Sequence, residues 1–425
     1  MRHRLLVVAG AVATVLLTAS SAQALPAQTP DASGGVNGPV RALAQAQGSG
    51  ENVIWIGGRF TQILSASGTS AAAASGLAPF DDTTGALDTS VHIPMVTGGT
   101  ATVYGMSLSG GILYFDGNFT AVDGTARKNV AAINPLTGAL LPFAPKGVAA
   151  ATSILATSSA IYVGTGKLLS FQLNGAKTAL YSPPVAHTDP TIRAHTTIAQ
   201  FRDIVEVGST LVAACQCDSM DDSNSLGHAV KAVVEIDATT GDLLSWAPAN
   251  LPASSAAFGI SLIADSSTID LAAGGNDFTA AYDFSSPGKQ QWKTDTSGSS
   301  QAIAMFEGEL VIGGHFDWTA SPSAGACGDN SSPNTKCYHT PKLVAMDPST
   351  GKVVLSAGVP WNPGICCKYN GLWVVLPDAN GSQLHVGGEF TKAGGTWSGS
   401  GTSWMLKMSK AHSNYARFSD APVPA

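Results

Sequence analysis

One short segment decides the fold of this chain, Ile56-Gly57-Gly58-Arg59-Phe60-Thr61. An apolar residue leads into two glycines, one polar residue and a phenylalanine. The segment returns in clear form at residues 115–120, 273–279, 312–316 and 386–391, and weaker copies lie at 162–164 and 212–215. A segment that recurs about every 55 residues is typical of solenoids, propellers and other repeat architectures.

A second segment follows the stronger copies. It reads Asp81-Asp82-Thr83-Thr84-Gly85 at first, and related Asp or Asn, Thr and Gly residues recur at 133–138, 236–241 and 346–351. An Asp or Asn side chain can hydrogen-bond to the backbone just after it, and glycine supplies the positive φ that closes a tight turn. We therefore interpret these acidic residues as parts of hairpin turns rather than as metal ligands.

Each period holds four short strands and shows no helical periodicity. The first strand is apolar, as at residues 40–44, and the second carries the Gly-Gly pair. The third alternates, as at 130–133, and the fourth follows the Thr-Gly, as at 243–246. Seven such units predict an all-β fold, a seven-bladed β-propeller with four antiparallel strands per blade. The third and fifth units are degenerate, so six or eight blades remain alternatives.

This pattern resembles the secreted actinobacterial β-propeller proteins with GGxF…DxxTG repeats, which are related to the delta-60 and PQQ-like repeat groups. The resemblance covers roughly residues 36–415. It implies a propeller fold and secretion. It implies no particular chemistry, because members of these groups are mostly uncharacterised and one fold supports many functions.

Composition and the N-terminus indicate the compartment. The 425 residues carry a formal charge of −7, which argues against a nucleic-acid partner. Two early arginines, an apolar run over 5–19 and a small-residue cleavage site predict a signal peptide over 1–24. We expect an extended arm over 25–38, a single propeller domain over 39–416 and a tail over 417–425. No later run is long enough for a transmembrane segment, so we expect a secreted, extracellular monomer.

The long connections are expected on one face of the ring. In an up-and-down blade, loops between strands two and three share a face with the connections between blades. The long stretches are of these two kinds: residues 61–76, 218–229, 317–341 and 391–403 within blades, and 88–101, 182–201 and 356–369 between them. Functional residues concentrate on loops, so we expect function on this long-loop face.

All six cysteines are expected on the same face. An even number of cysteines in an exported protein indicates disulfides. Pairing of nearest neighbours gives Cys215–Cys217, Cys327–Cys337 and Cys366–Cys367. Cross-links between the first and last of these pairs remain an alternative, as does a thiolate metal site with Asp218 and His228, and we expect no metal.

The residue after each Gly-Gly pair suggests a binding surface. It is polar in every clear copy, and loop aromatics lie nearby; the candidates are Arg59, Asn118, Asn276, His315, Glu389, Trp318, Trp361, Trp397 and Tyr338. Aromatic faces suit sugar rings, and polar side chains suit hydroxyl groups. We expect a binding or scaffold protein without catalytic residues, whose long-loop face recognises an extracellular glycan or protein.

Two enzymatic alternatives remain. Quinoprotein alcohol dehydrogenases resemble this chain in the segment Ala345-Met346-Asp347-Pro348-Ser349-Thr350-Gly351 and in having adjacent cysteines, like Cys366 and Cys367. That resemblance implies calcium and the quinone PQQ as cofactors, but the Trp spacing and blade number differ, and we expect no cofactor. A funnel hydrolase would need paired carboxylates. The candidates for it are Asp203, Asp218, Asp277 and Glu389.

Overall fold

The computed structural model describes residues 25–48, 52–180, 184–186, 199–224, 226–251, 257–285, 287–322, 325, 327, 336–356, 359–368, 370–399 and 405–419. The expected signal peptide and residues 420–425 lie outside this range. Every regular element in the described residues is a β-strand. Among them there is no helix long and apolar enough to cross a membrane. The all-β prediction is therefore confirmed.

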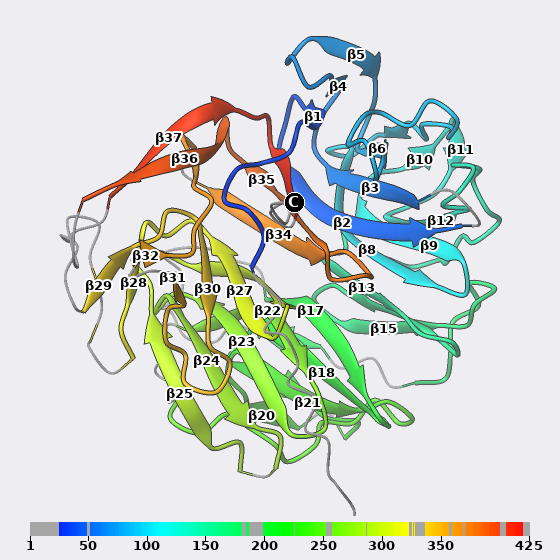
Figure 1. Ribbon diagram of the computed structural model, residues 1–425. Coiled ribbons are helices and arrows are strands. Elements are labelled where there is room, and N and C mark those ends of the chain that lie inside the picture. Colours follow the sequence, from blue (N-terminus) through cyan, green and yellow to red (C-terminus); the bar gives the residue numbers. More distant parts are fainter. Residues whose placement is uncertain are drawn as a thin grey trace, which may run out of the picture.

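Within the described ranges, seven sheets radiate from one axis and form a β-propeller (Figure 1). We number the blades by their innermost strands, which are β2 (Val40–Gln47), β8 (Thr102–Ser109), β13 (Ser153–Ala156), β17 (Gln200–Val207), β22 (Phe258–Ala264), β26 (Ser300–Phe306) and β34 (Gly371–Pro377). Each innermost strand packs against the next in chain order, and β34 packs against β2. The described sheets therefore close into a ring.

Two more strands complete the inner part of each blade. The second strands are β3 (Asn52–Gly58), β9 (Ile112–Asn118), β14 (Ile161–Gly164), β18 (Thr210–Gln216), β23 (Thr268–Gly274), β27 (Glu309–Gly314) and β35 (Gln383–Glu389). The third strands are β6 (Leu77–Asp81), β12 (Val130–Ile133), β15 (Leu168–Phe171), β21 (Val233–Asp237), β24 (Phe278–Asp283), β30 (Leu343–Met346) and β38 (Tyr415–Ser419). The fourth strand is β25 (Gln290–Asp295) in blade 5, and single bridges such as Phe80–Leu87 take its place in other blades.

The Gly-Gly pair allows two close approaches. A Cβ atom on Gly57 would lie 2.4 Å from the Met106 side chain of the next blade. A Cβ atom on Gly58 would lie 2.1 Å from the Pro39 carbonyl oxygen of its own blade. The phenylalanine that follows the pair is buried in each clear copy: Phe60, Phe119, Phe278, Phe316 and Phe390. The repeated segment is therefore a packing device that joins strands within and between blades.

The second repeated segment forms the predicted turns. The backbone N–H of Thr84 donates to the Asp81 carboxylate at 2.6 Å, and that of Gly85 donates to the Asp81 carbonyl at 2.8 Å. In the turns that begin at Asn134, Asp237 and Asp347, the side chain of that first residue likewise accepts from the backbone N–H three residues later. The interpretation of these residues as turn residues is confirmed.

The long connections form a second tier of small sheets. Hairpins lie between the second and third strands of five blades: β4–β5 (Gln62–Leu64, Ser70–Ala73), β10–β11 (Ala121–Val122, Thr125–Ala126), β19–β20 (Ser219–Asp221, Gly227–Ala229), β28–β29 (Trp318–Ala320, Cys337–His339) and β36–β37 (Lys392–Ser398, Met405–Ala411). Four of them pair with a strand of the preceding connection: β1 (Gly35–Val36), β7 (Val96–Thr97), β16 (Val185–Ala186) and β33 (Ile365–Cys366). A short pair, β31 (Leu355–Ser356) and β32 (Val359–Pro360), completes the strands. Figure 1 shows β4–β5 and β36–β37 projecting outward from the ring.

The N-terminal arm takes part in closing the ring. The backbone N–H of Ala27 donates to the Ser419 carbonyl at 2.9 Å, and that of Asp31 donates to the Arg417 carbonyl at 3.0 Å. The arm therefore lies along β38 and occupies the outer position in blade 7. Backbone hydrogen bonds thus join the first described residues to the last strand, which resists opening of the ring between blades 7 and 1.

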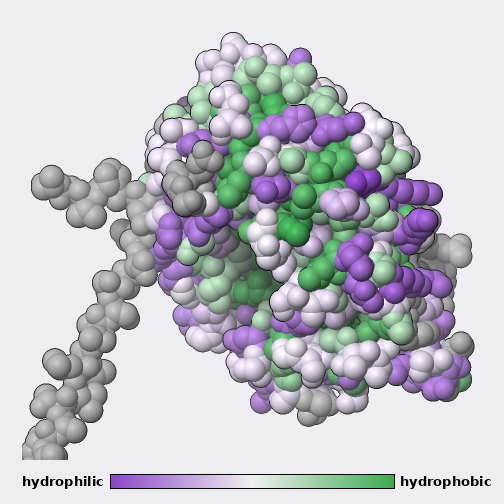
Figure 2. All heavy atoms as spheres, turned by 90° about the vertical axis from the view of Figure 1, so that its right-hand side faces the viewer, coloured by the Kyte–Doolittle hydropathy of each residue, from purple (hydrophilic) through white to green (hydrophobic). Residues whose placement is uncertain are grey.

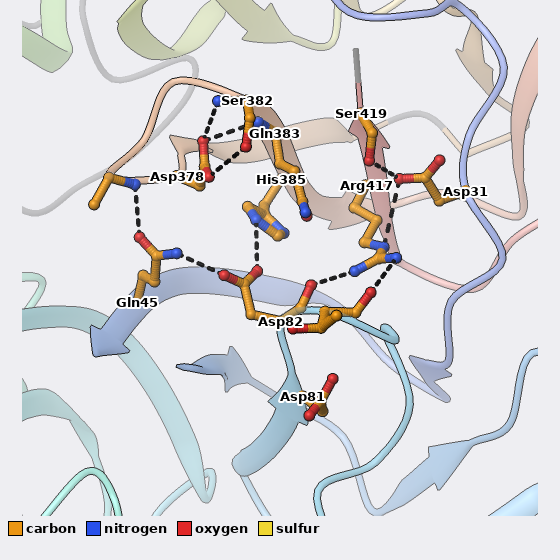
Figure 3. A network of polar contacts seen from close by, with 12 residues as sticks. Asp31, Gln45, Asp81, Asp82, Asp378, Ser382, Gln383, His385, Arg417 and Ser419 are labelled. Atoms are coloured by element: carbon orange, nitrogen blue, oxygen red, sulfur yellow. Dashed lines mark hydrogen bonds and ion pairs between the residues drawn. The ribbon is translucent and has the colours of Figure 1, made fainter. Parts of the chain in front are cut away.

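A buried polar network reinforces this closure (Figure 3). Fully buried His385 of blade 7 lies with its Nε2 3.2 Å from Asp82 of blade 1, and its Nδ1 lies 2.8 Å from the Tyr415 hydroxyl. The Gln45 side chain donates to Asp82 at 2.6 Å, and the Arg417 guanidinium donates to the Asp82 carbonyl. Burial raises the pKa of Asp82, but the hydrogen bonds from His385 and Gln45 and the charge of Arg417 outweigh it, so the pKa is lowered.

Substitution of Gly58 tests the packing role of the pair. We expect Gly58→Ala to lower the free energy of unfolding by about 1–3 kcal/mol, because the added methyl group meets a backbone carbonyl. Gly166→Ala is the matched control, since its Cβ would lie 3.5 Å from the nearest atom, an ordinary contact. Denaturant unfolding of both variants is the measurement. Equal stability of the two variants would contradict this role.

The closure network makes stability depend on acid pH. Because the pKa of Asp82 is lowered by folding, its contribution is full above about pH 4, the ordinary value, and is lost as the pH falls through the lowered value. We expect Asp82→Asn to reduce stability at pH 7 by about 1–3 kcal/mol and to differ less from the parent at pH 3. Thermal unfolding from pH 3 to 7 measures this, with exposed Glu206→Gln as the control. A deficit of Asp82→Asn that is constant over this range would contradict the role given to Asp82.

Candidate functional site

A recurring β-bulge marks the inner end of the blades. In six of the seven described blades, one residue near the start of the innermost strand has no partner on the second strand. The residues left out are Arg41, Tyr104, Arg202, Ile260, Gln301 and Trp373. Strand β13 pairs without such a shift. A bulge redirects the side chain of its extra residue, and bulges recur next to functional sites.

Four of these bulge residues meet at the axis. The Arg41 guanidinium carbon lies 3.8 Å from the centre of the Trp373 ring, a cation–π contact. The charge of Arg41 lowers the pKa of Arg202, and Tyr104 raises the pKa of both arginines. The two arginines interact in this way although blades 2 and 3 separate β2 from β17 along the ring. All four residues hold the same bulge position near the start of an innermost strand, and the innermost strands surround the axis (Figure 1). We call Arg41, Tyr104, Arg202 and Trp373 the axial cluster.

The two axial cations are only weakly compensated. Burial and the positive charge of Arg41 lower the pKa of Arg202 to about 10, and Tyr104 acts in the other direction. Burial also lowers the pKa of Arg41, against the effects of Tyr104 and Glu389. All four side chains of the axial cluster remain partly exposed, so solvent reaches them. Two guanidinium groups therefore face the same partly desolvated space.

Glu389 and Gln301 are fixed beside this cluster. The Asn370 amide donates to the Glu389 carboxylate at 2.6 Å. The Gln301 amide is oriented with its nitrogen toward the carbonyl oxygens of Leu372 and Asn370, at 2.7 and 2.9 Å, and its oxygen accepts from His315 Nδ1 at 3.3 Å. His315 Nε2 in turn accepts from a backbone N–H at 3.2 Å. These bonds hold the start of β34 against blade 6.

The predicted rim residues occupy related positions, with one exception. Arg59, Asn118, His315 and Glu389 each follow the glycine that faces the start of the innermost strand. Asn276 does not, because the second and third strands of blade 5 are joined by a tight turn in which Asn276 is exposed. Arg59 is also exposed, and the other three are partly exposed.

The predicted exposure of the aromatic residues is wrong in part. Trp318 is 5% exposed and Trp361 is 3% exposed, so neither offers a free face. The Trp361 Nε1–H donates to the Pro26 carbonyl at 2.9 Å, and that of half-buried Trp397 donates to the Gln28 side chain at 2.8 Å. Trp318 packs on His339 with ring centres 4.9 Å apart. These side chains hold the N-terminal arm and a hairpin, and no local sequence pattern predicts such distant contacts.

The candidate acids for hydrolysis are engaged in structural contacts. The Asp203 carboxylate accepts from Ser261 Oγ at 2.9 Å and from the Leu262 N–H at 3.0 Å, which ties blade 4 to blade 5. The Asp277 carboxylate accepts from Ser299 Oγ at 2.8 Å. Asp116, at a glycine position of the repeat, is fully buried, and burial raises its pKa to about 7 against the backbone N–H groups of Gly105 and Asp116.

The cysteines form the three nearest-neighbour disulfides, Cys215–Cys217, Cys327–Cys337 and Cys366–Cys367. All three lie in or beside second-tier strands, on the face where they were expected. Cys215 and Cys217 are therefore not thiolates available to a metal. Within the described part of the chain, no three His, Cys, Asp or Glu side chains are grouped to hold a metal ion.

Comparison with known proteins finds similarity in structure only. Neither a protein-family model nor a curated protein matches the sequence. The chain is similar to the WD40 β-propeller domain of Doa1 (11% identity, 84% of this chain and 93% of that chain, TM-score 0.48). It is also similar to the computationally designed Ika8 protein (12%, 85% and 97%, TM-score 0.48). A third is the extracellular domain of a protein described as a hybrid two-component system from B. thetaiotaomicron (12%, 85% and 39%, TM-score 0.46). The propeller fold follows from the sheet topology, and function must be argued from this chain alone.

Asp116 provides a test of the buried acids. A carboxyl group whose pKa rises on folding lowers the free energy of unfolding when it is ionised. For Asp116 this loss of stability appears as the pH rises from about 4 to above 7. We expect Asp116→Asn to be more stable than the parent at pH 8, by about 1–3 kcal/mol, and not at pH 4. Unfolding by denaturant at both pH values is the measurement. A loss of stability at pH 8 would show that the ionised group is needed.

Proposed function

We propose that this protein is a secreted binding module that holds an extracellular macromolecule, a glycan or a protein, on its long-loop face. The observation that carries the proposal is the difference between the two faces. On the short-turn face the acidic residues cap their own turns, as Asp81 and Asp347 do. The other face carries five added hairpins, the three disulfides and the start of each innermost strand, with its bulge residue.

Further features support a binding role rather than turnover. The candidate acids Asp203 and Asp277 are occupied by contacts that join strands or blades. Three disulfides suit an oxidising extracellular compartment. Figure 2 shows the outer side near β10 and β11, where hydrophobic and hydrophilic residues are interspersed.

Two charge reversals on opposite faces test this proposal. Arg59→Glu alters the long-loop face and Lys352→Glu alters a short-turn hairpin, and both positions are exposed. We expect the parent protein to be retained by insoluble extracellular polysaccharide or by immobilised extracellular protein. Arg59→Glu should reduce retention by about threefold or more, and Lys352→Glu should leave it unchanged, because only the first charge lies at the binding face.

Two results would overturn the proposal. One is an equal effect of both reversals, or no retention on either class of bait. The other is reduction of a redox dye above background after addition of calcium and PQQ, which would favour the quinone-dependent alternative.

A further inference from the structure

We propose that the axial cluster binds one carboxylate group of the ligand between Arg41 and Arg202, and that the ligand is an acidic glycan containing uronate residues. This inference rests on the proposed function, since it names the ligand chemistry at the same face. It assigns a role to the bulge residues, which the repeat pattern alone leaves unexplained.

The first support is the excess of donors at the axis. Two guanidinium groups carry about ten N–H donors, and arginine has no acceptor. Among the described residues, no hydrogen bond or ion pair involves the side chain of Arg202, and the side chain of Arg41 has its contact with the Trp373 ring. The Trp373 Nε1–H is buried and likewise has no acceptor. Since Arg41 and Arg202 are partly exposed, their N–H donors are open to a ligand that supplies carboxylate oxygens.

The second support is the arrangement of charge. Arg41 and Arg202 come from blades 1 and 4, which are not neighbours in the ring. A planar carboxylate accepts two parallel N–H bonds from one guanidinium and can bridge two guanidinium groups. Binding of an anion would also relieve the repulsion between the cations.

The local charge favours an anion with a single charge. The two arginines contribute two positive charges, and Glu389, whose charge acts on Arg41, contributes one negative charge. Glu389 is held by its bond from Asn370 and does not lie within ion-pair distance of either arginine. The remaining charge of one matches a carboxylate better than a phosphate dianion, because a second negative charge would lie near Glu389 uncompensated.

The neighbouring groups favour a sugar acid over a peptide terminus. The hydroxyl groups of a uronate can exchange hydrogen bonds with the Tyr104 hydroxyl. A peptide C-terminus instead presents an amide N–H that requires an acceptor, and the axial cluster consists mainly of donors. An aromatic ring beside the cations also suits the C–H face of a sugar.

Calorimetric titration with small probes tests the site separately from retention of a polymer. The probes are D-glucuronate, neutral D-glucose, acetate and glycylglycine, added to the full mature protein. We expect glucuronate to bind in the millimolar range, acetate to bind more weakly and glucose not to bind. Arg202→Met should weaken glucuronate binding about tenfold or more, Arg202→Lys less, and the matched charge removal Lys352→Met not at all. Circular dichroism establishes that each variant is folded.

The outcomes separate this inference from the proposed function. Binding of glucose as tight as that of glucuronate, unchanged affinity in Arg202→Met, or tighter binding of glycylglycine would each overturn the inference. Polymer retention without glucuronate binding would overturn the axial site and leave the binding function standing. Glucuronate binding without retention of any polymer or protein would support the axial site and overturn the proposed function.

Discussion

The close approach of the innermost strand to the Gly-Gly pair is the constraint on which the rest of the structure depends. The Pro39 carbonyl oxygen lies 2.1 Å from the place of a Cβ atom on Gly58. Two residues after Pro39, Arg41 is left out of the pairing between β2 and β3. The same shift in register recurs at Trp373 beside Gly388. A packing requirement within the bulged blades thereby supplies the four residues of the axial cluster. The repeat that builds the ring also creates its candidate binding site.

The two faces of the ring divide stability and recognition between them. Tight Asx-type turns and the network of Asp82, His385 and Arg417 join strands and blades at the short-turn face. At the other face, four of the second-tier hairpins pair with a strand that precedes their blade, and the disulfides Cys327–Cys337 and Cys366–Cys367 lie in these outer segments. The N-terminal arm links the two ends of the ring, since Trp361 binds its backbone and β38 lies beside it.

The sequence predicts the features that rest on local chemistry and misses those that rest on register. The Gly-Gly-x-Phe and Asp-x-x-Thr-Gly segments predicted the strands, the turns and the propeller. Each residue type has a local role there: glycine adopts positive φ or allows a close approach, proline presets φ, and Asx side chains bond to the backbone just after them. The axial cluster was not predicted, because the position of a bulge depends on how two strands pair. A charged residue in an apolar strand, Arg41, was the available signal. Trp361 was misplaced because its partner, the Pro26 carbonyl, lies at the far end of the chain.

A crystal structure of the protein grown with D-glucuronate tests the central claim most directly. The account predicts that Arg41 and Arg202 project from their bulges toward the axis and that carboxylate density bridges the two guanidinium groups. Innermost strands without bulges, or arginines that are paired with carboxylates of the protein while glucuronate binds elsewhere, would contradict it.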